Sequence, residues 1–88
     1  MPLNLKTYQS QLAQLVALPS VSCGVPSWDM SNLPVIELLA NWFSDLGFST
    51  QIIPLPQTGK ANLIATLGSG DGGLVLAGHS DTVPYDAN

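Results

Sequence analysis

The single histidine of this chain stands two residues before an aspartate, in the run Ala-Gly-His79-Ser-Asp81-Thr-Val-Pro. Side chains alternate along an extended strand, so His79 and Asp81 point to the same side and an imidazole can meet a carboxylate. A metal-bound histidine usually donates its other ring N–H to a carboxylate, which fixes its tautomer and raises its basicity. The spacing therefore suits His79 as a metal ligand and Asp81 as the carboxylate of the catalytic set that orients it. It suits a purely structural histidine as well.

Three other groups of residues fit a chemical role less well. Ser80 lies between a histidine and an aspartate, but consecutive strand residues face opposite ways, and the Gly-x-Ser-x-Gly turn of a serine nucleophile is missing. The glycine-rich residues 68–73 invite a phosphate-loop interpretation, yet they lead into a predicted strand and not into a helix, which favours a hairpin turn. Cys23 has no basic group or histidine beside it in the sequence, so we interpret it as a small side chain in a loop.

Two helices are predicted in the first half of the chain. Apolar residues recur at helical spacing over residues 4–18, and Pro19 closes that segment. The second helix starts where Asn32 can cap it, has Pro34 in its first turn, and runs to Gly47, the usual residue just past a helix end. Burial of its apolar side chains roughly balances the cost of ordering it, so this helix needs a sheet to lie on.

Three strands are predicted in the second half, over residues 48–53, 62–67 and 74–77. The first two alternate in polarity, whereas the third is apolar at every position and is predicted to be a central strand buried on both faces. The fold class is therefore α/β, with two N-terminal helices followed by three strands of a mainly mixed sheet. His79 then follows the carboxyl end of the central strand, where open α/β sheets gather their ligands.

Composition limits the size and the partners of this domain. With 88 residues, of which 45% are apolar and 9% charged, the chain suits one folded domain and lacks the signature of disorder. Two lysines, no arginine and a net charge of −4 make a nucleic-acid partner improbable on electrostatic grounds. The sequence has neither a basic cluster nor an apolar run long enough to predict membrane association, and its first residues do not have the pattern of a signal peptide. A lone cysteine fits a reducing, cytoplasmic setting.

The run from Leu74 to Pro84 resembles the first metal motif of the M20 zinc metallopeptidases and deacylases. Further similarity covers the segments 40–48, 62–65 and 70–74 and extends to Tyr85-Asp86. The resemblance implies that residues 1–88 are the N-terminal fragment of a zinc-peptidase-like catalytic domain. It also implies that the rest of that domain and the family's dimerisation domain lie outside this chain.

For the site, the resemblance implies that His79 binds one of two zinc or cobalt ions and that Asp81 orients it. The family's other ligands and its glutamate base would lie beyond residue 88. A complete enzyme of this kind is a dizinc amide hydrolase for a small N-acyl amino acid and can be a homodimer, while the fragment alone is expected to be inactive. Family members that remove acetyl or succinyl groups or cleave dipeptides share this signature, and a non-catalytic small α/β module is the alternative from another class.

Overall fold

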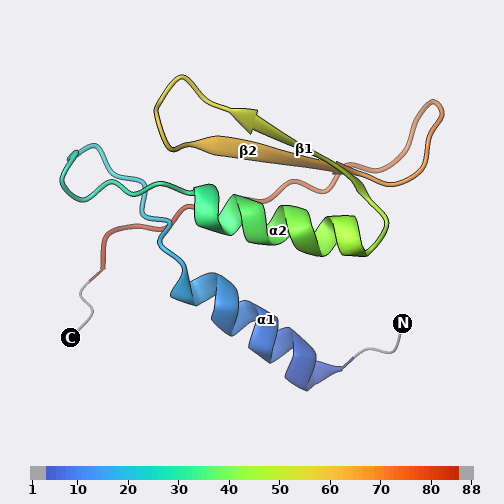
Figure 1. Cartoon of the computed structure of the whole chain (residues 1–88), viewed down its shortest axis with the longest axis horizontal. Helices are drawn as coiled ribbons and strands as arrows, with labels where there is room; N and C mark the ends of the chain where they lie inside the picture. The colour runs from blue at the N-terminus through green and yellow to red at the C-terminus, as the bar shows by residue number, and fades with distance from the viewer. Residues whose placement is uncertain (1–3, 86–88) are drawn as a thin grey trace.

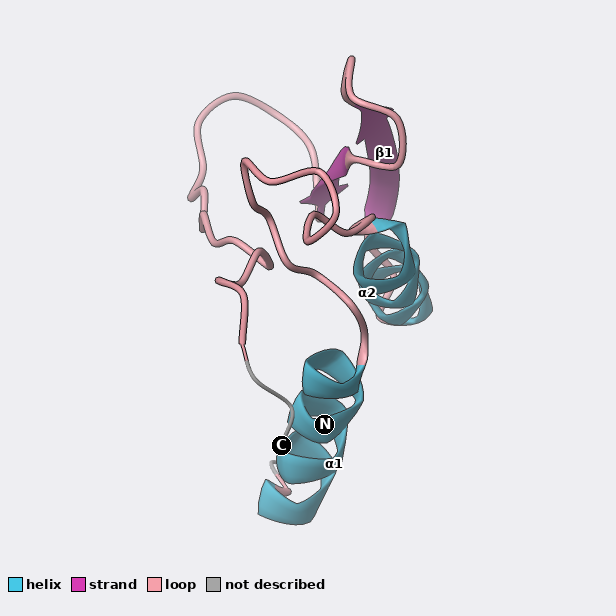
Figure 2. Ribbon diagram, turned by 90° about the vertical axis from the view of Figure 1, so that its left-hand side faces the viewer, coloured by secondary structure: helices cyan, strands magenta, loops and turns pink. Residues whose placement is uncertain are grey.

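The computed structural model describes residues 4–85, which form two helices followed by two strands (Figure 1). The elements are α1 (Leu5–Ala17), α2 (Leu33–Asp45), β1 (Ser49–Pro54) and β2 (Ala61–Thr66). The strands pair as an antiparallel hairpin, and α2 packs against both of them. Figure 2 shows α1 standing apart from this two-layer unit, to which a long connecting loop joins it. The chain is thus a small α/β unit, as predicted, with fewer strands than expected.

Helix α1 confirms the first predicted helix to within one residue at each end. Its cap is Asn4, whose side-chain oxygen accepts hydrogen bonds from the N–H groups of Lys6 and Thr7, at 2.9 and 3.3 Å. None of its residues is buried, because the other described elements leave its apolar stripe open to solvent. The exposed fractions along this stripe are 71% for Leu5, 50% for Tyr8, 62% for Leu12 and 75% for Val16.

Helix α2 confirms the second predicted helix and supplies most of the core. It begins with Pro34 in its first turn and buries Val35, Ile36 and Ala40. After its last turn Gly47 adopts a φ of 93°, and the N–H of the next residue bonds back to the carbonyl of Phe43. The described core is completed by Val21 and Ala61, so it lies between α2, the start of β2 and the loop that follows α1.

The β1–β2 hairpin has one covered and one open face. Opposite residues share a face. In β2 the alternate residues Ala61, Leu63 and Ala65 are buried or half-buried, so they mark the covered face. On the other face Ile64 is 48% exposed. Each strand lies one residue from its predicted position, and within residues 4–85 neither helix is long and apolar enough to span a bilayer.

The prediction of a central third strand over residues 74–77 is wrong for this structure. Leu74, Val75 and Leu76 are 84%, 89% and 87% exposed and belong to no strand. Figure 2 shows this part of the chain as a wide loop away from the hairpin. An apolar strand is stable only between neighbours that complete its hydrogen bonds and cover both its faces, and the described residues supply neither.

Because residues 74–77 form no strand, two related predictions are also wrong for this structure. The sheet of the described residues is antiparallel and two-stranded, where a mainly mixed sheet was expected. Residues 68–73 form an irregular, bent loop with four glycines at positive φ, but without a strand after them they do not make the expected hairpin. No helix follows this loop within residues 4–85 either, so the phosphate-loop alternative has no structural support.

Candidate functional site

The structure brings the two predicted site residues together. Nδ1 of His79 lies 3.0 Å from Oδ1 of Asp81, a separation at which a ring N–H can donate to a carboxylate. Both side chains are largely exposed, at 82% and 61%, so solvent weakens their attraction. The attraction between the two side chains therefore does little to fix their separation, and the backbone around them must set it.

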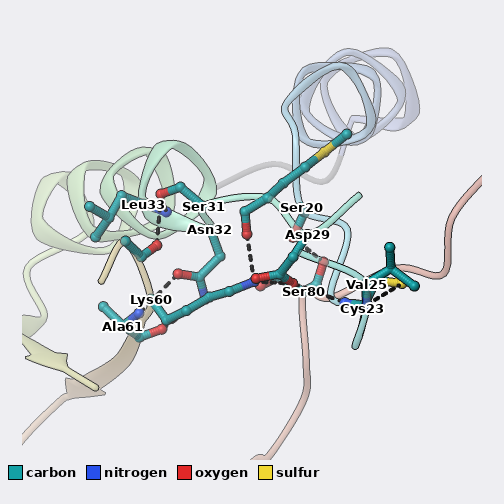
Figure 3. Close-up of polar contacts among 12 residues, drawn as sticks. Ser20, Cys23, Val25, Asp29, Ser31, Asn32, Leu33, Lys60, Ala61 and Ser80 are labelled. Carbon is teal, nitrogen blue, oxygen red and sulfur yellow. Dashed lines mark hydrogen bonds and ion pairs between the residues drawn. The ribbon is translucent and has the colours of Figure 1, made fainter. Parts of the chain in front are cut away.

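That backbone is held by a short parallel pairing with the loop after α1. Val21 pairs with Thr82, the N–H of Ser22 donates to the Thr82 carbonyl at 3.1 Å, and the N–H of Thr82 donates to the Ser20 carbonyl at 3.0 Å. The Ser20 hydroxyl also donates to the carbonyl of Ser80 at 2.6 Å (Figure 3). The segment that carries His79 and Asp81 is therefore fixed by residues that lie 60 or more positions earlier in the chain.

The loop after α1 is itself held from its other side. The N–H of Met30 donates to the Val21 carbonyl at 2.8 Å, and Oδ1 of Asp29 accepts from the N–H of Cys23 at 2.9 Å. The Lys60 ammonium lies 3.0 Å from the same oxygen and also donates to the Met30 carbonyl (Figure 3). The bond from Cys23, together with Lys60, holds the pKa of Asp29 below its usual value. Residues from the hairpin thus support the loop that supports the site.

An open cleft of about 440 Å³ adjoins His79. It lies between the end of α1, one side of α2 and the segment after the glycine-rich loop. Its walls are mostly apolar, and His79 is the one ionisable imidazole among them; the lining residues are Leu15, Val16, Leu18, Ser20, Val35, Leu39, His79, Ser80, Thr82 and Tyr85. The cleft gives His79 apolar neighbours on one side, while most of its side chain faces solvent.

The donor set fits one corner of a metal site. Nδ1 of His79 faces Asp81, which leaves Nε2 as the ring nitrogen available to a metal. Within residues 4–85, no group of three or more histidine, cysteine, aspartate or glutamate side chains is close enough to hold a metal ion. This part of the chain therefore offers one imidazole paired with a carboxylate, and a closed metal site would need further ligands from elsewhere.

Ser20 holds the backbone of the site through two hydrogen bonds, yet nothing in its local sequence indicates this role. Its position among turn-forming residues gave no signal, because the partner of its hydroxyl is 60 positions away. Cys23 is half-buried in the loop, as expected, and its sulfur accepts a hydrogen bond from the N–H of Val25 at 3.4 Å.

Comparison with known proteins gives a consistent result. The acetylornithine deacetylase of Proteus mirabilis (strain HI4320) is 54% identical over 87 residues, which are 98% of this chain and 22% of that enzyme. The chain resembles acetylornithine deacetylases. Those of Vibrio campbellii (strain ATCC BAA-1116) and Pasteurella multocida (strain Pm70) are each 51% identical, over 98% and 94% of this chain. No family model matches the chain. The chain spans about a fifth of the length of these relatives.

Proposed function

We propose that this chain is part of a metal-dependent amide hydrolase of the M20 type that converts N-acetylornithine and water to ornithine and acetate, a reaction of arginine biosynthesis. The observation that carries the proposal is the identity of 54% over 98% of the chain to an enzyme named for that deacetylation. The close pair of His79 and Asp81 supports it, because the pair has the form of a metal ligand with its orienting carboxylate.

In this role His79 would hold one of two zinc or cobalt ions through Nε2. A bound metal of this kind lowers the pKa of its water to about 7 and polarises the amide carbonyl. Asp81 accepts the Nδ1–H of the imidazole, which keeps the proton on Nδ1 and the lone pair on Nε2. The carboxylate also restrains the direction of the ring. A side chain that is 82% exposed would otherwise lack such a restraint.

We place the remaining parts of the proposed site in the rest of the enzyme, because the chain spans 22% of the length of the Proteus mirabilis relative. These parts are the further metal ligands, the general base and the contacts to substrate. A single imidazole with water in the remaining positions binds metal weakly. The 88-residue chain by itself should therefore release no ornithine above background, and its activity has to be tested within a full-length enzyme.

The experiment is a chimera in which the 87 matched residues of the Proteus mirabilis enzyme are replaced by those of this chain. The purified chimera is assayed with N-acetylornithine, N-succinyl-diaminopimelate and a dipeptide as competing substrates. The proposal predicts turnover of N-acetylornithine within tenfold of the parent enzyme and preference for it over the other two.

Two variants of the chimera serve as controls. His79→Ala should lose at least a hundredfold in kcat/KM, whereas Gln51→Ala, which changes an exposed residue on the open face of the hairpin, should keep parental activity. A folded chimera without deacetylase activity, or a His79→Ala variant as active as the chimera, would contradict the proposal.

A further inference from the structure

Ser20 is the one buried residue with a polar side chain in the part of the chain that the structure describes. It is 7% exposed and comes three residues after the end of α1. A hydroxyl removed from water requires a hydrogen-bond partner, and here the partner is the carbonyl of Ser80, at 2.6 Å. The bond joins two segments that are otherwise distant along the chain.

The two bonds of Ser20 lie on either side of Asp81. Its hydroxyl donates to the carbonyl of Ser80, which belongs to the peptide group that precedes Asp81. Its own carbonyl accepts from the N–H of Thr82, which belongs to the peptide group that follows Asp81. One residue therefore fixes both peptide planes that determine where the Asp81 side chain points.

We propose that Ser20 is a positioning residue that directs the Asp81 carboxylate toward Nδ1 of His79; this inference rests on the proposed function of that pair. The exposed carboxylate and imidazole attract each other weakly through solvent, so their 3.0 Å approach depends on the direction of the backbone. Without the Ser20 hydroxyl, the peptide before Asp81 is free to rotate and the carboxylate leaves the ring. The ring then loses the partner that keeps its proton on Nδ1.

A purely structural role for Ser20 makes a different prediction. In that case loss of the hydroxyl lowers stability, but every folded molecule keeps the ring tautomer of the parent chain. The tautomer of His79 therefore separates the two roles. It can be read without ambiguity because the chain contains one histidine.

The test is the nitrogen NMR spectrum of His79 in the metal-free 88-residue chain at about pH 9, above the range in which imidazole titrates. The variants are Ser20→Ala, the shape-matched pair Ser20→Thr and Ser20→Val, and Ser22→Ala. Ser22→Ala is the matched control, because Ser22 contributes its backbone N–H to the pairing and this N–H is kept. The amide signal of Ala61, which is 1% exposed, reports whether each variant is folded.

The proposal predicts that the parent chain, Ser20→Thr and Ser22→Ala keep the proton mainly on Nδ1. Ser20→Ala and Ser20→Val should lose that majority and hold the proton mainly on Nε2. Unchanged tautomers in folded Ala and Val variants would overturn the proposal, as would unfolding of both beside a folded Thr variant, because the hydroxyl would then serve the fold as a whole. Since no metal or substrate is present, failure here leaves the deacetylase proposal standing, and failure of the chimera leaves this result unaffected.

Discussion

Replacement of Asn32 by alanine is expected to remove a large part of the free energy of unfolding of this chain. The Asn32 side chain makes two bonds to one residue: its amide donates to the carbonyl of Ala61 and its oxygen accepts from the N–H of Ala61, both at 2.9 Å (Figure 3). The bond from Leu55 N–H to the Lys60 carbonyl shows why these groups are available. In an antiparallel ladder the bonds alternate, so both backbone groups of Ala61 point away from β1, and Asn32 takes the place of a third strand.

The size of the effect follows from the burial of Ala61. This residue is 1% exposed, and each buried backbone group left without a partner costs about 1–3 kcal/mol. Two such groups give about 2–6 kcal/mol, and water entering beside the half-buried Asn32 keeps the loss near the lower half, about 2–4 kcal/mol. A folded domain has about 5–15 kcal/mol in total, and small domains lie near the lower limit. No helix-cap term is added, because the Asn32 side chain makes no bond to α2 and the Ser31 hydroxyl accepts from the Leu33 N–H instead.

Urea unfolding followed by tryptophan fluorescence measures the change in the free energy of unfolding, and hydrogen exchange locates it. The Ala61 amide should lose its protection in Asn32→Ala. Asn62→Ala is the matched control, since Asn62 is exposed on the same strand, and it should change stability by no more than about 0.5 kcal/mol. The reasoning is refuted if the two variants are equally stable, or if Asn32→Ala keeps the Ala61 amide protected and exposes the first turn of α2.

Three further predictions test other parts of the fold. The pKa of Asp29 is lower in the folded chain than in the unfolded one, so its contribution to the free energy of unfolding is complete above the ordinary aspartate pKa of about 3.9 and is lost as pH falls through the folded value. Urea midpoints should therefore fall more steeply below about pH 4 in the parent chain than in Asp29→Asn or Lys60→Met. Equal slopes would contradict this. Ile36→Ala should cost about 2–5 kcal/mol in urea unfolding because Ile36 is 6% exposed, whereas Ile64→Ala, at a 48% exposed position, should cost less than half as much. Gly47→Ala should lower the thermal midpoint, because a residue with a Cβ at a φ of 93° costs about 1 kcal/mol in stability. Crowding is not the cause, since a Cβ there meets no atom within 4 Å. An unchanged midpoint would argue against that strain.

The elements that sequence could predict are those whose signals are local. The apolar period of α2, Pro34 in its first turn and Gly47 after its end all lie within fifteen residues, and the helix formed where they indicate. Asn32 was correctly placed at the start of α2, but its side chain bonds to Ala61 and not to the helix, because a long-range partner competes with the local one.

The strand at residues 74–77 could not be judged from its own sequence. A run of apolar residues indicates that a strand must be buried on both faces, but it does not show whether the neighbouring elements that would bury it are present. For the same reason the local His-x-Asp spacing predicted the approach of His79 and Asp81, while the support that Ser20 gives their backbone was invisible. The local sequence was therefore enough to predict that the two side chains approach each other, but not which distant residues fix the backbone that carries them.

The proposed role of His79 as a metal ligand oriented by Asp81 can be tested through the metal content of the chimera. After dialysis against a zinc buffer, the ions bound per chain are counted by mass spectrometry for the chimera and for its His79→Ala, Asp81→Asn and Gln51→Ala variants. We expect two ions for the chimera and Gln51→Ala, loss of one ion in His79→Ala, and a metal affinity lowered about 10–100-fold in Asp81→Asn. Equal metal content and equal affinity in all four proteins would contradict it.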